Sequence, residues 1–303
     1  MAEVEGSEVA DGVGSVFAPA HAAPFEAIAH HGLAGALHRT AADLPAVRQI
    51  TRVVHPMLVV LEVPQAVGMR LPCGRQVRRE IDQFGNLVIS LSADHIAKEI
   101  TFTAWILAER DTTAGPILVT RQLYEGDLLH EFSRLTEPDD ALRVAAAEIG
   151  PAASERDLAD RICAWVYASM NYREGATDVS TTAVQAFARR EGVCQDYAHI
   201  MLALCRLRGL AARYVSGHLL GEGGTHAWVE VLLPDPQQRN RFIAQPLDPT
   251  HDRVPGASYL TVATGRDYSD VAPTSGAYRG KHTGQLFTSK HAGVTAVEYF
   301  DRQ

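Results

Sequence analysis

Apolar residues recur every three or four positions between Tyr197 and Leu207, and this spacing predicts a helix with a buried face. The spaced positions are Tyr197, Ala198, Ile200, Met201, Leu204, Cys205 and Leu207. A turn at Gly192 precedes this run, and Gly209 after it is typical of a helix end. Cys194 therefore lies where a turn becomes the first turn of the helix.

Two stretches with the alternating pattern of β-strands follow this helix. Residues 224–233 alternate around Val229 and Val231, and His226 lies near their start. Residues 241–250 form a second short strand that ends at Asp248, just before a proline. Because only a short polar turn separates the two stretches, we expect neighbouring strands. Residues 212–220 predict a third strand, which we expect to pair with the His226 strand.

The region before this unit is β-rich. Strands are predicted within residues 53–63, 82–91, 99–109 and 116–122, and several short strands separated by turns indicate an antiparallel sandwich or barrel. Helices are predicted at 140–149, at 154–170 with Ser154 as the N-cap, and at 181–190, with a loop at 171–180 that carries Tyr172. A weaker pattern suggests a helix at 25–39, and the C-terminal tail ends in a strand that could extend either sheet.

These patterns predict an α+β fold in three parts. Residues 1–45 form a mobile or weakly structured segment, residues 46–136 a small all-β domain, and residues 137–303 the unit that carries Cys194. The role expected for the β domain is to form one wall of a cleft or to recognise substrate; a purely stabilising role is an equal alternative.

Cys194 is a candidate nucleophile. The positive end of a helix dipole stabilises a thiolate and lowers the pKa of a thiol placed there, and the free N–H groups of the first turn can bind an oxyanion. A lone cysteine is more often a small core residue. The sequence also supplies His226 as a base and Asp248 as the group that orients it, in the order nucleophile, base, orienter.

At these residues the chain resembles the transglutaminase-like superfamily, in particular its bacterial branch of cysteine peptidases and amidases. The matching segments are Gly192–His199, Ala212–His218, Thr225–Glu230, Leu247–Thr250 and the later Gly265–Pro273. The resemblance implies a papain-like core, with the nucleophile helix packed on an antiparallel sheet, preceded in many relatives by a β domain. It also implies Cys194 as nucleophile, His226 as base and Asp248 as orienter. Tyr172, Gln195 and Trp228 are candidate cleft residues.

Composition and charge indicate which classes of partner the protein is expected to lack. The chain has 303 residues, 46% hydrophobic content and a net charge of −8, which argues against a nucleic-acid partner. No apolar run is long enough to span a bilayer, and the acidic N-terminus lacks the features of a signal peptide, so a cytoplasmic bacterial protein is expected. The oligomeric state is left open.

No metal or other cofactor is expected. His21, His30, His31 and His38 lack accompanying ligands at metal spacing, and no run of acids resembles a calcium loop. The cysteines are Cys73, Cys163, Cys194 and Cys205, with no metal or disulfide pattern. Cys163 and Cys205 lie in apolar helical runs and are expected in the core.

The expected chemistry is acyl transfer on an amide through a thioester. Capture of the thioester by water gives a peptidase or amidase acting on a peptide, protein or amide, which is the favoured interpretation, and capture by an amine gives a transglutaminase. A non-enzymatic binding module that keeps the fold is an alternative from another class. Metal-dependent hydrolysis is a third interpretation, for which the sequence shows no ligand pair.

Overall fold

The computed structural model describes residues 8–9, 13–17, 46–54, 64–70, 76–92, 103–111, 115–221, 225–272, 275–279 and 291–300. Side chains are described within 78–90, 115–221 and 225–272. The helix predicted at 25–39, the four histidines between residues 21 and 38, and Cys73 lie outside the described residues.

A five-stranded antiparallel sheet forms the centre of the region around Cys194, in the order β14-β11-β12-β13-β8. Its strands are β8 (Ile117–Val119), β11 (Ala212–Leu219), β12 (Thr225–Pro234), β13 (Phe242–Leu247) and β14 (Tyr259–Gly265). The predicted pairing of the strands that carry His226 and Asp248 is confirmed, since β12 pairs with β13. β11 pairs with β12, also as predicted.

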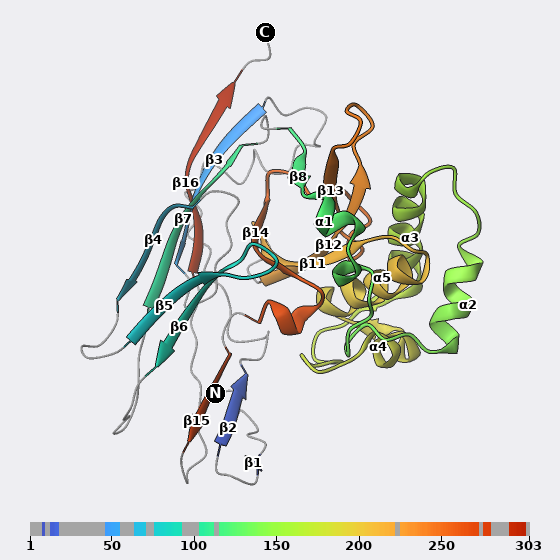
Figure 1. Ribbon diagram of the computed structural model, residues 1–303, viewed down its shortest axis with the longest axis horizontal. Helices are drawn as coiled ribbons and strands as arrows, with labels where there is room; N and C mark the ends of the chain where they lie inside the picture. Colours follow the sequence, from blue (N-terminus) through green and yellow to red (C-terminus); the bar gives the residue numbers. More distant parts are fainter. Residues whose placement is uncertain are drawn as a thin grey trace.

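Helices gather on one side of this sheet (Figure 1). They are α2 (Asp140–Glu148), α3 (Glu155–Ser169), α4 (Ala183–Arg189) and α5 (Cys194–Leu207). α3 begins where predicted, because the Ser154 side chain accepts a hydrogen bond from the backbone N–H of Asp157. The short helices α1 (Arg121–Glu125), η1 (Asp127–Leu129) and η2 (Tyr268–Asp270) were not predicted. The fold is thus α+β, with helices packed on an antiparallel sheet.

α5 is buried on all sides, not on one face. Every residue from Gln195 to Arg206 is buried, because the helix lies between β12 on one side and α2, α3 and α4 on the others. Arg206 donates hydrogen bonds to the carbonyl groups of Leu129, Ala212 and Arg266. A buried guanidinium needs such acceptors, so this arginine ties three segments of the chain to the end of α5.

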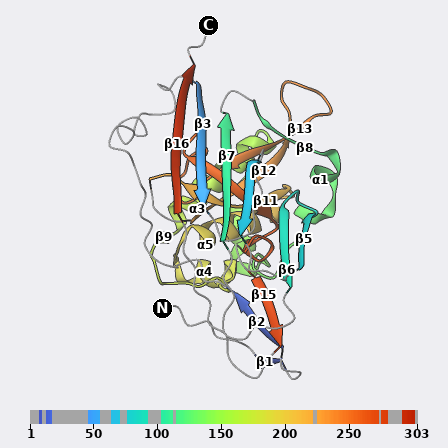
Figure 2. The same ribbon diagram turned by 90° about the vertical axis from the view of Figure 1, so that its left-hand side faces the viewer.

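A second antiparallel sheet has the order β16-β3-β7-β4, and Figure 2 shows its strands side by side. The strands are β3 (Ala46–Val54), β4 (Pro64–Arg70), β7 (Thr103–Asp111) and β16 (His291–Phe300). Smaller pairings join β5 (Gln76–Ile81) with β6 (Leu87–Ser92), and β1 (Glu8–Val9) and β15 (Ser275–Arg279) with β2 (Val13–Phe17). Of the strand predicted at 53–63, only the first two residues fall in β3, and residues 55–63 are outside the described ones.

Two strands pair across the predicted domain limit near residue 136. β8 was predicted with the N-terminal strands, but it pairs with β13. The tail strand β16 pairs with β3, so the chain returns to the N-terminal strands at its end. The three domain ranges themselves stay predictions.

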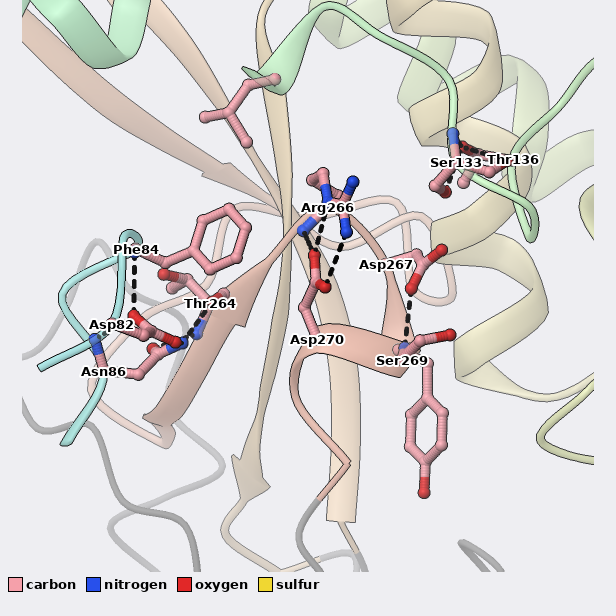
Figure 3. Close-up of polar contacts among 12 residues, drawn as sticks. Asp82, Phe84, Asn86, Ser133, Thr136, Thr264, Arg266, Asp267, Ser269 and Asp270 are labelled. Atoms are coloured by element: carbon pink, nitrogen blue, oxygen red, sulfur yellow. Dashed lines mark hydrogen bonds and ion pairs between the residues drawn. The ribbon is translucent and has the colours of Figure 1, made fainter. Parts of the chain in front are cut away.

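Asn86, in the turn between β5 and β6, binds the edge strand β14 (Figure 3). Its side-chain amide donates to the Thr264 carbonyl at 2.8 Å and accepts from the Thr264 N–H at 3.0 Å. The side chain thus satisfies both backbone groups of one residue at the sheet edge, as a neighbouring strand would.

In the part of the chain that the structure describes, no helix combines the length and apolarity needed to cross a membrane.

Candidate active site

Cys194 is the first residue of α5, and the residue is partly buried. The short strand β10 (Glu191–Gly192) leads to it. Asp196, in the first turn, accepts the backbone N–H of Val193 at 2.8 Å and so caps the helix start. Gly192 is required by the close packing here, because a Cβ atom at this position would lie 2.5 Å from Asp196 Oδ2.

His226 and Asp248 meet because β12 and β13 are adjacent and antiparallel. His226 is the second residue of β12, Asp248 follows the last residue of β13, and His226 Nε2 lies 2.8 Å from Asp248 Oδ2. The Cys194 side chain is also close enough to the His226 ring to contribute to the raised pKa of that ring. Since Nε2 contacts Asp248, Nδ1 is the nitrogen left for the thiol. The three residues predicted as nucleophile, base and orienter are therefore brought together.

Two further side chains reach the same carboxylate oxygen, and sequence reasoning missed both. His251 Nδ1 lies 2.7 Å from Asp248 Oδ2, and the Tyr259 hydroxyl donates to it at 2.5 Å. The backbone N–H of Thr250 donates to Oδ1 at 2.9 Å. His251 and Thr250 come from the turn directly after Asp248, and an Asp-Pro-Thr turn signal is consistent with such local bonds.

The surroundings favour a negative charge on Asp248 and a positive charge on His226. Burial disfavours the carboxylate, but the hydrogen bonds from His226, His251 and Tyr259 outweigh it and hold the pKa of Asp248 well below its usual range. Burial likewise disfavours the imidazolium, but the hydrogen bonds to Asp248 and Cys194 outweigh it and raise the pKa of His226 to about 10. A charged carboxylate and a charged imidazole are therefore favoured together at neutral pH.

Packing of aromatic side chains holds the His226 ring in position. Trp228 lies on the same face of β12, with its ring centroid 6.2 Å from that of His226, and Tyr259 packs edge-on against Trp228 at 5.3 Å. Trp228 is fully buried, so it supports His226 from the core and does not lie at an open surface. Gly217 is needed beneath it, since a Cβ atom there would lie 2.4 Å from the indole ring.

The other candidate cleft residues, Tyr172 and Gln195, differ in exposure. Tyr172 is half exposed on the short strand β9 (Asn171–Tyr172), where a loop was predicted, and it pairs with Gly192 two residues before Cys194. Gln195 is buried, and its side-chain amide donates to the Asp178 carbonyl at 3.4 Å. Tyr172 is thus an exposed residue near the start of α5, whereas Gln195 is buried and bonds the backbone of Asp178.

Among the described residues, His226, Asp248 and His251 form a cluster with the composition of a metal site. Their nitrogen and oxygen atoms are 2.7 and 2.8 Å apart, which is hydrogen-bond length. Ligands around a zinc ion at about 2.0–2.1 Å would be separated by roughly 3.3 Å. The cluster therefore fits two imidazoles that share a carboxylate better than it fits a metal site.

Cys163 and Cys205 are buried, as predicted. Burial raises the pKa of the Cys205 thiol to about 12 and raises that of Cys163 even further. Cys194 is thus the only described cysteine that is not fully buried.

Comparisons with known proteins show what part of the chain is similar to a known family. Residues 143–245 match the model of the transglutaminase-like superfamily, a range that includes Cys194 and His226 and stops before Asp248. An uncharacterized protein of Mycobacterium tuberculosis is 44% identical over 132 residues, which are 40% of this chain and 40% of that protein. The match thus spans less than half the length of this relative. An uncharacterized protein of Mycobacterium leprae is 28% identical over 221 residues, covering 67% of this chain and 76% of that protein.

Among solved structures, a Cytophaga hutchinsonii protein described as a "Putative Cysteine Protease" superposes with a TM-score of 0.56. It is 22% identical in sequence and covers 85% of this chain and 89% of its own. This likeness concerns the fold. Residues 143–245 thus match the core of the transglutaminase-like superfamily in sequence, and the solved structure shares the fold.

Proposed function

We propose that this protein is a cysteine-dependent enzyme that hydrolyses an amide bond of a peptide, protein or smaller amide through a thioester. Cys194 is the nucleophile, His226 the general base and acid, and Asp248 the group that orients His226. The observation that carries the proposal is the position of the His226 ring, whose Nε2 lies 2.8 Å from Asp248 Oδ2 and whose pKa is also raised by the neighbouring Cys194 side chain.

In the first half of the reaction, His226 Nδ1 holds the proton of the Cys194 thiol while the sulfur attacks the amide carbonyl. Asp248 keeps Nε2 protonated, which leaves Nδ1 to exchange the proton with the sulfur and the leaving group. The backbone N–H of Cys194 is in the first turn of α5, where N–H groups lack helical acceptors, so it can donate to the oxyanion. Collapse of the tetrahedral intermediate releases the amine, which takes its proton from His226.

In the second half, water attacks the thioester and returns the thiol. His226 takes a proton from this water and gives it to the departing sulfur, so the enzyme ends in its starting state. An amine in place of water would give transglutaminase-type transfer with the same residues. Cys194 is only partly buried, which supports access by water.

The test of the enzyme class is labelling of Cys194 with a thiol-reactive acyl probe, followed by peptide mapping. We expect the label on Cys194 in the native protein, a much slower reaction in His226→Ala, and none at this site in Cys194→Ala. Cys205→Ala is the matched control, since it removes a buried thiol from the same helix. Labelling of Cys194 that is equally fast without His226 would contradict the proposal and favour a binding module.

The two fates of the thioester are separated by mass spectrometry of a glutamine-containing peptide incubated with the protein, with and without a primary amine. Hydrolysis raises the peptide mass by the change from amide to acid, or cleaves the chain, whether or not the amine is present. An amine adduct as the main product would overturn the hydrolytic assignment and leave the nucleophile assignment in place.

A further inference from the structure

Asp248 Oδ2 contacts three side chains, of which the reaction proposed above uses only His226. We propose that Tyr259 and His251 are positioning residues, which share this oxygen with His226 and so limit how strongly Asp248 holds the proton on the imidazole ring. The inference rests on the proposed role of His226 as the base, and it concerns what sets the affinity of this base for its proton.

The carboxylate oxygen is saturated by these contacts. A carboxylate oxygen offers about two lone pairs, and Oδ2 lies at 2.8, 2.7 and 2.5 Å from the donors of His226, His251 and Tyr259. Asp248 is fully buried, and Oδ1 accepts the Thr250 N–H. The negative charge is therefore spread over donors that surround it, and a proton could bind Oδ2 only by displacing one of them.

Arg253 sets the direction of the Tyr259 hydroxyl. Its Nε donates to the phenol oxygen at 2.7 Å, and because a phenol has a single proton, that proton points to Asp248. Arg253 is held there by the backbone, since its N–H and carbonyl bond the carbonyl and N–H of Asp248. The turn after β13 thus brings the chain back to Asp248.

The groups around the His226 ring determine how strongly the ring holds its proton. Those that face His226 are Cys194 from α5, Asp248 after β13, His251 from the following turn and Tyr259 from β14. Arg253, from the same turn as His251, bonds the Tyr259 hydroxyl. Each additional donor to Oδ2 weakens the attraction between Asp248 and a protonated His226. A general base that also acts as an acid must release its proton again, so an unshared carboxylate would hold that proton too firmly.

Replacement of Tyr259 by phenylalanine removes the hydroxyl and keeps the ring, so it distinguishes the effect of the one from that of the other. The aromatic packing against Trp228 and His226 involves the ring and is preserved in Tyr259→Phe. A residue with only a packing role would leave the titration of His226 unchanged, whereas loss of a shared donor raises the affinity of His226 for its proton.

The experiment uses the full-length protein with Cys194→Ala as background, so that neither chemistry nor the thiol affects the titration. The histidines are labelled with nitrogen-15, and the His226 signals are followed by NMR as a function of pH. We expect Tyr259→Phe to raise the pKa of His226 by about half to one unit, a roughly three- to tenfold lower dissociation constant for its proton. Tyr167→Phe, an exposed tyrosine on α3, is the control and should cause no shift.

A second variant keeps the test decisive if Tyr259→Phe does not fold. His251→Ala removes the other donor from a turn whose histidine side chain is 28% exposed, and it should raise the pKa of His226 in the same direction. An unchanged or lowered pKa of His226 in the folded variants would overturn the proposal. Because the background lacks the nucleophile, this outcome is independent of the labelling test of Cys194.

Discussion

The charge of His226 links the site to the stability of the whole fold. Its pKa is about 10 in the native protein and about 6.5 when unperturbed. A raised native pKa means that the folded state holds the proton more tightly than the unfolded chain. The stabilisation is therefore complete below about pH 6.5 and is lost as the pH rises to about 10.

We therefore predict that His226→Gln lowers the melting temperature most near pH 6. The difference from the unmodified protein should shrink steadily as the pH is raised to 10, because the wild-type histidine loses its proton over this interval. Calorimetry or circular dichroism at a series of pH values measures this difference in melting temperature. A difference that stays constant from pH 6 to pH 10 would show that His226 is not charged in the native state.

Asp248 orients the base but does not react itself. Asp248→Asn keeps the shape of the side chain, yet it presents an amide to His226 and Tyr259 in place of a carboxylate. We expect probe labelling of Cys194 to slow by about 10²- to 10⁴-fold, less than the complete loss in Cys194→Ala. An unchanged labelling rate would remove Asp248 from the proposed mechanism.

The three residues that the sequence predicts for the site each follow or precede a clear local pattern. Cys194 follows a glycine turn, His226 begins an alternating strand, and Asp248 precedes a proline, so each has a position that local pattern defines. Tyr259 and His251 carry no such signal. His251 reaches Asp248 within the local turn after β13, whereas the contact of Tyr259 with Asp248 depends on the pairing of β14 with β11, which is a tertiary feature.

At the scale of elements, the start of α5 depends on close packing between Gly192 and Asp196. Gly192→Ala would place a methyl group 2.5 Å from Asp196 Oδ2, so the cap of the helix must shift and Cys194 with it. We expect slower labelling of Cys194 with the fold retained. Gly256→Ala is the matched control, because a Cβ atom there meets nothing within 4 Å. Equal labelling rates in both variants would argue against a precisely placed helix start.

The turn between β5 and β6 is predicted to stabilise the edge strand β14. Asn86→Ala leaves the N–H and carbonyl of Thr264 without their side-chain partner, and each unpaired buried group costs about 1–3 kcal/mol. We expect the free energy of unfolding to fall by about 2–4 kcal/mol in a denaturant titration. Arg78→Ala, at an exposed position of β5, should change it by less than about 0.5 kcal/mol. Similar values for the two variants would contradict this role of Asn86.

Elements with strong periodicity were predicted well, and short or contact-dependent ones were not. α3 and α5 have long apolar repeats and start signals, and both were found. β9 is two residues long and exists because it pairs with β10, a contact that no local pattern encodes. The burial of α5 on all sides was also missed, since the polar residues His199 and Arg206 suggest a solvent face until their buried partners are known.

For the molecule as a whole, the sequence predicted the α+β class and two groups of strands, but not how the chain connects them. β8 joins the sheet of β12 and β13, and β16 joins the sheet of β3, although each lies on the other side of the predicted domain limit. Strand partners far apart in sequence are selected by the whole fold, so a boundary drawn from composition alone does not reveal them.

The central claim is that Cys194 and His226 form a reactive pair in the resting protein, and a brief iodoacetamide treatment near pH 6 tests it most directly. Less than about 1% of an ordinary thiol is ionised at this pH. The account predicts that peptide mapping finds Cys194 modified well before Cys73, Cys163 and Cys205, and that His226→Ala slows Cys194 selectively. Faster modification of another cysteine, or an unchanged Cys194 rate in His226→Ala, would contradict the account.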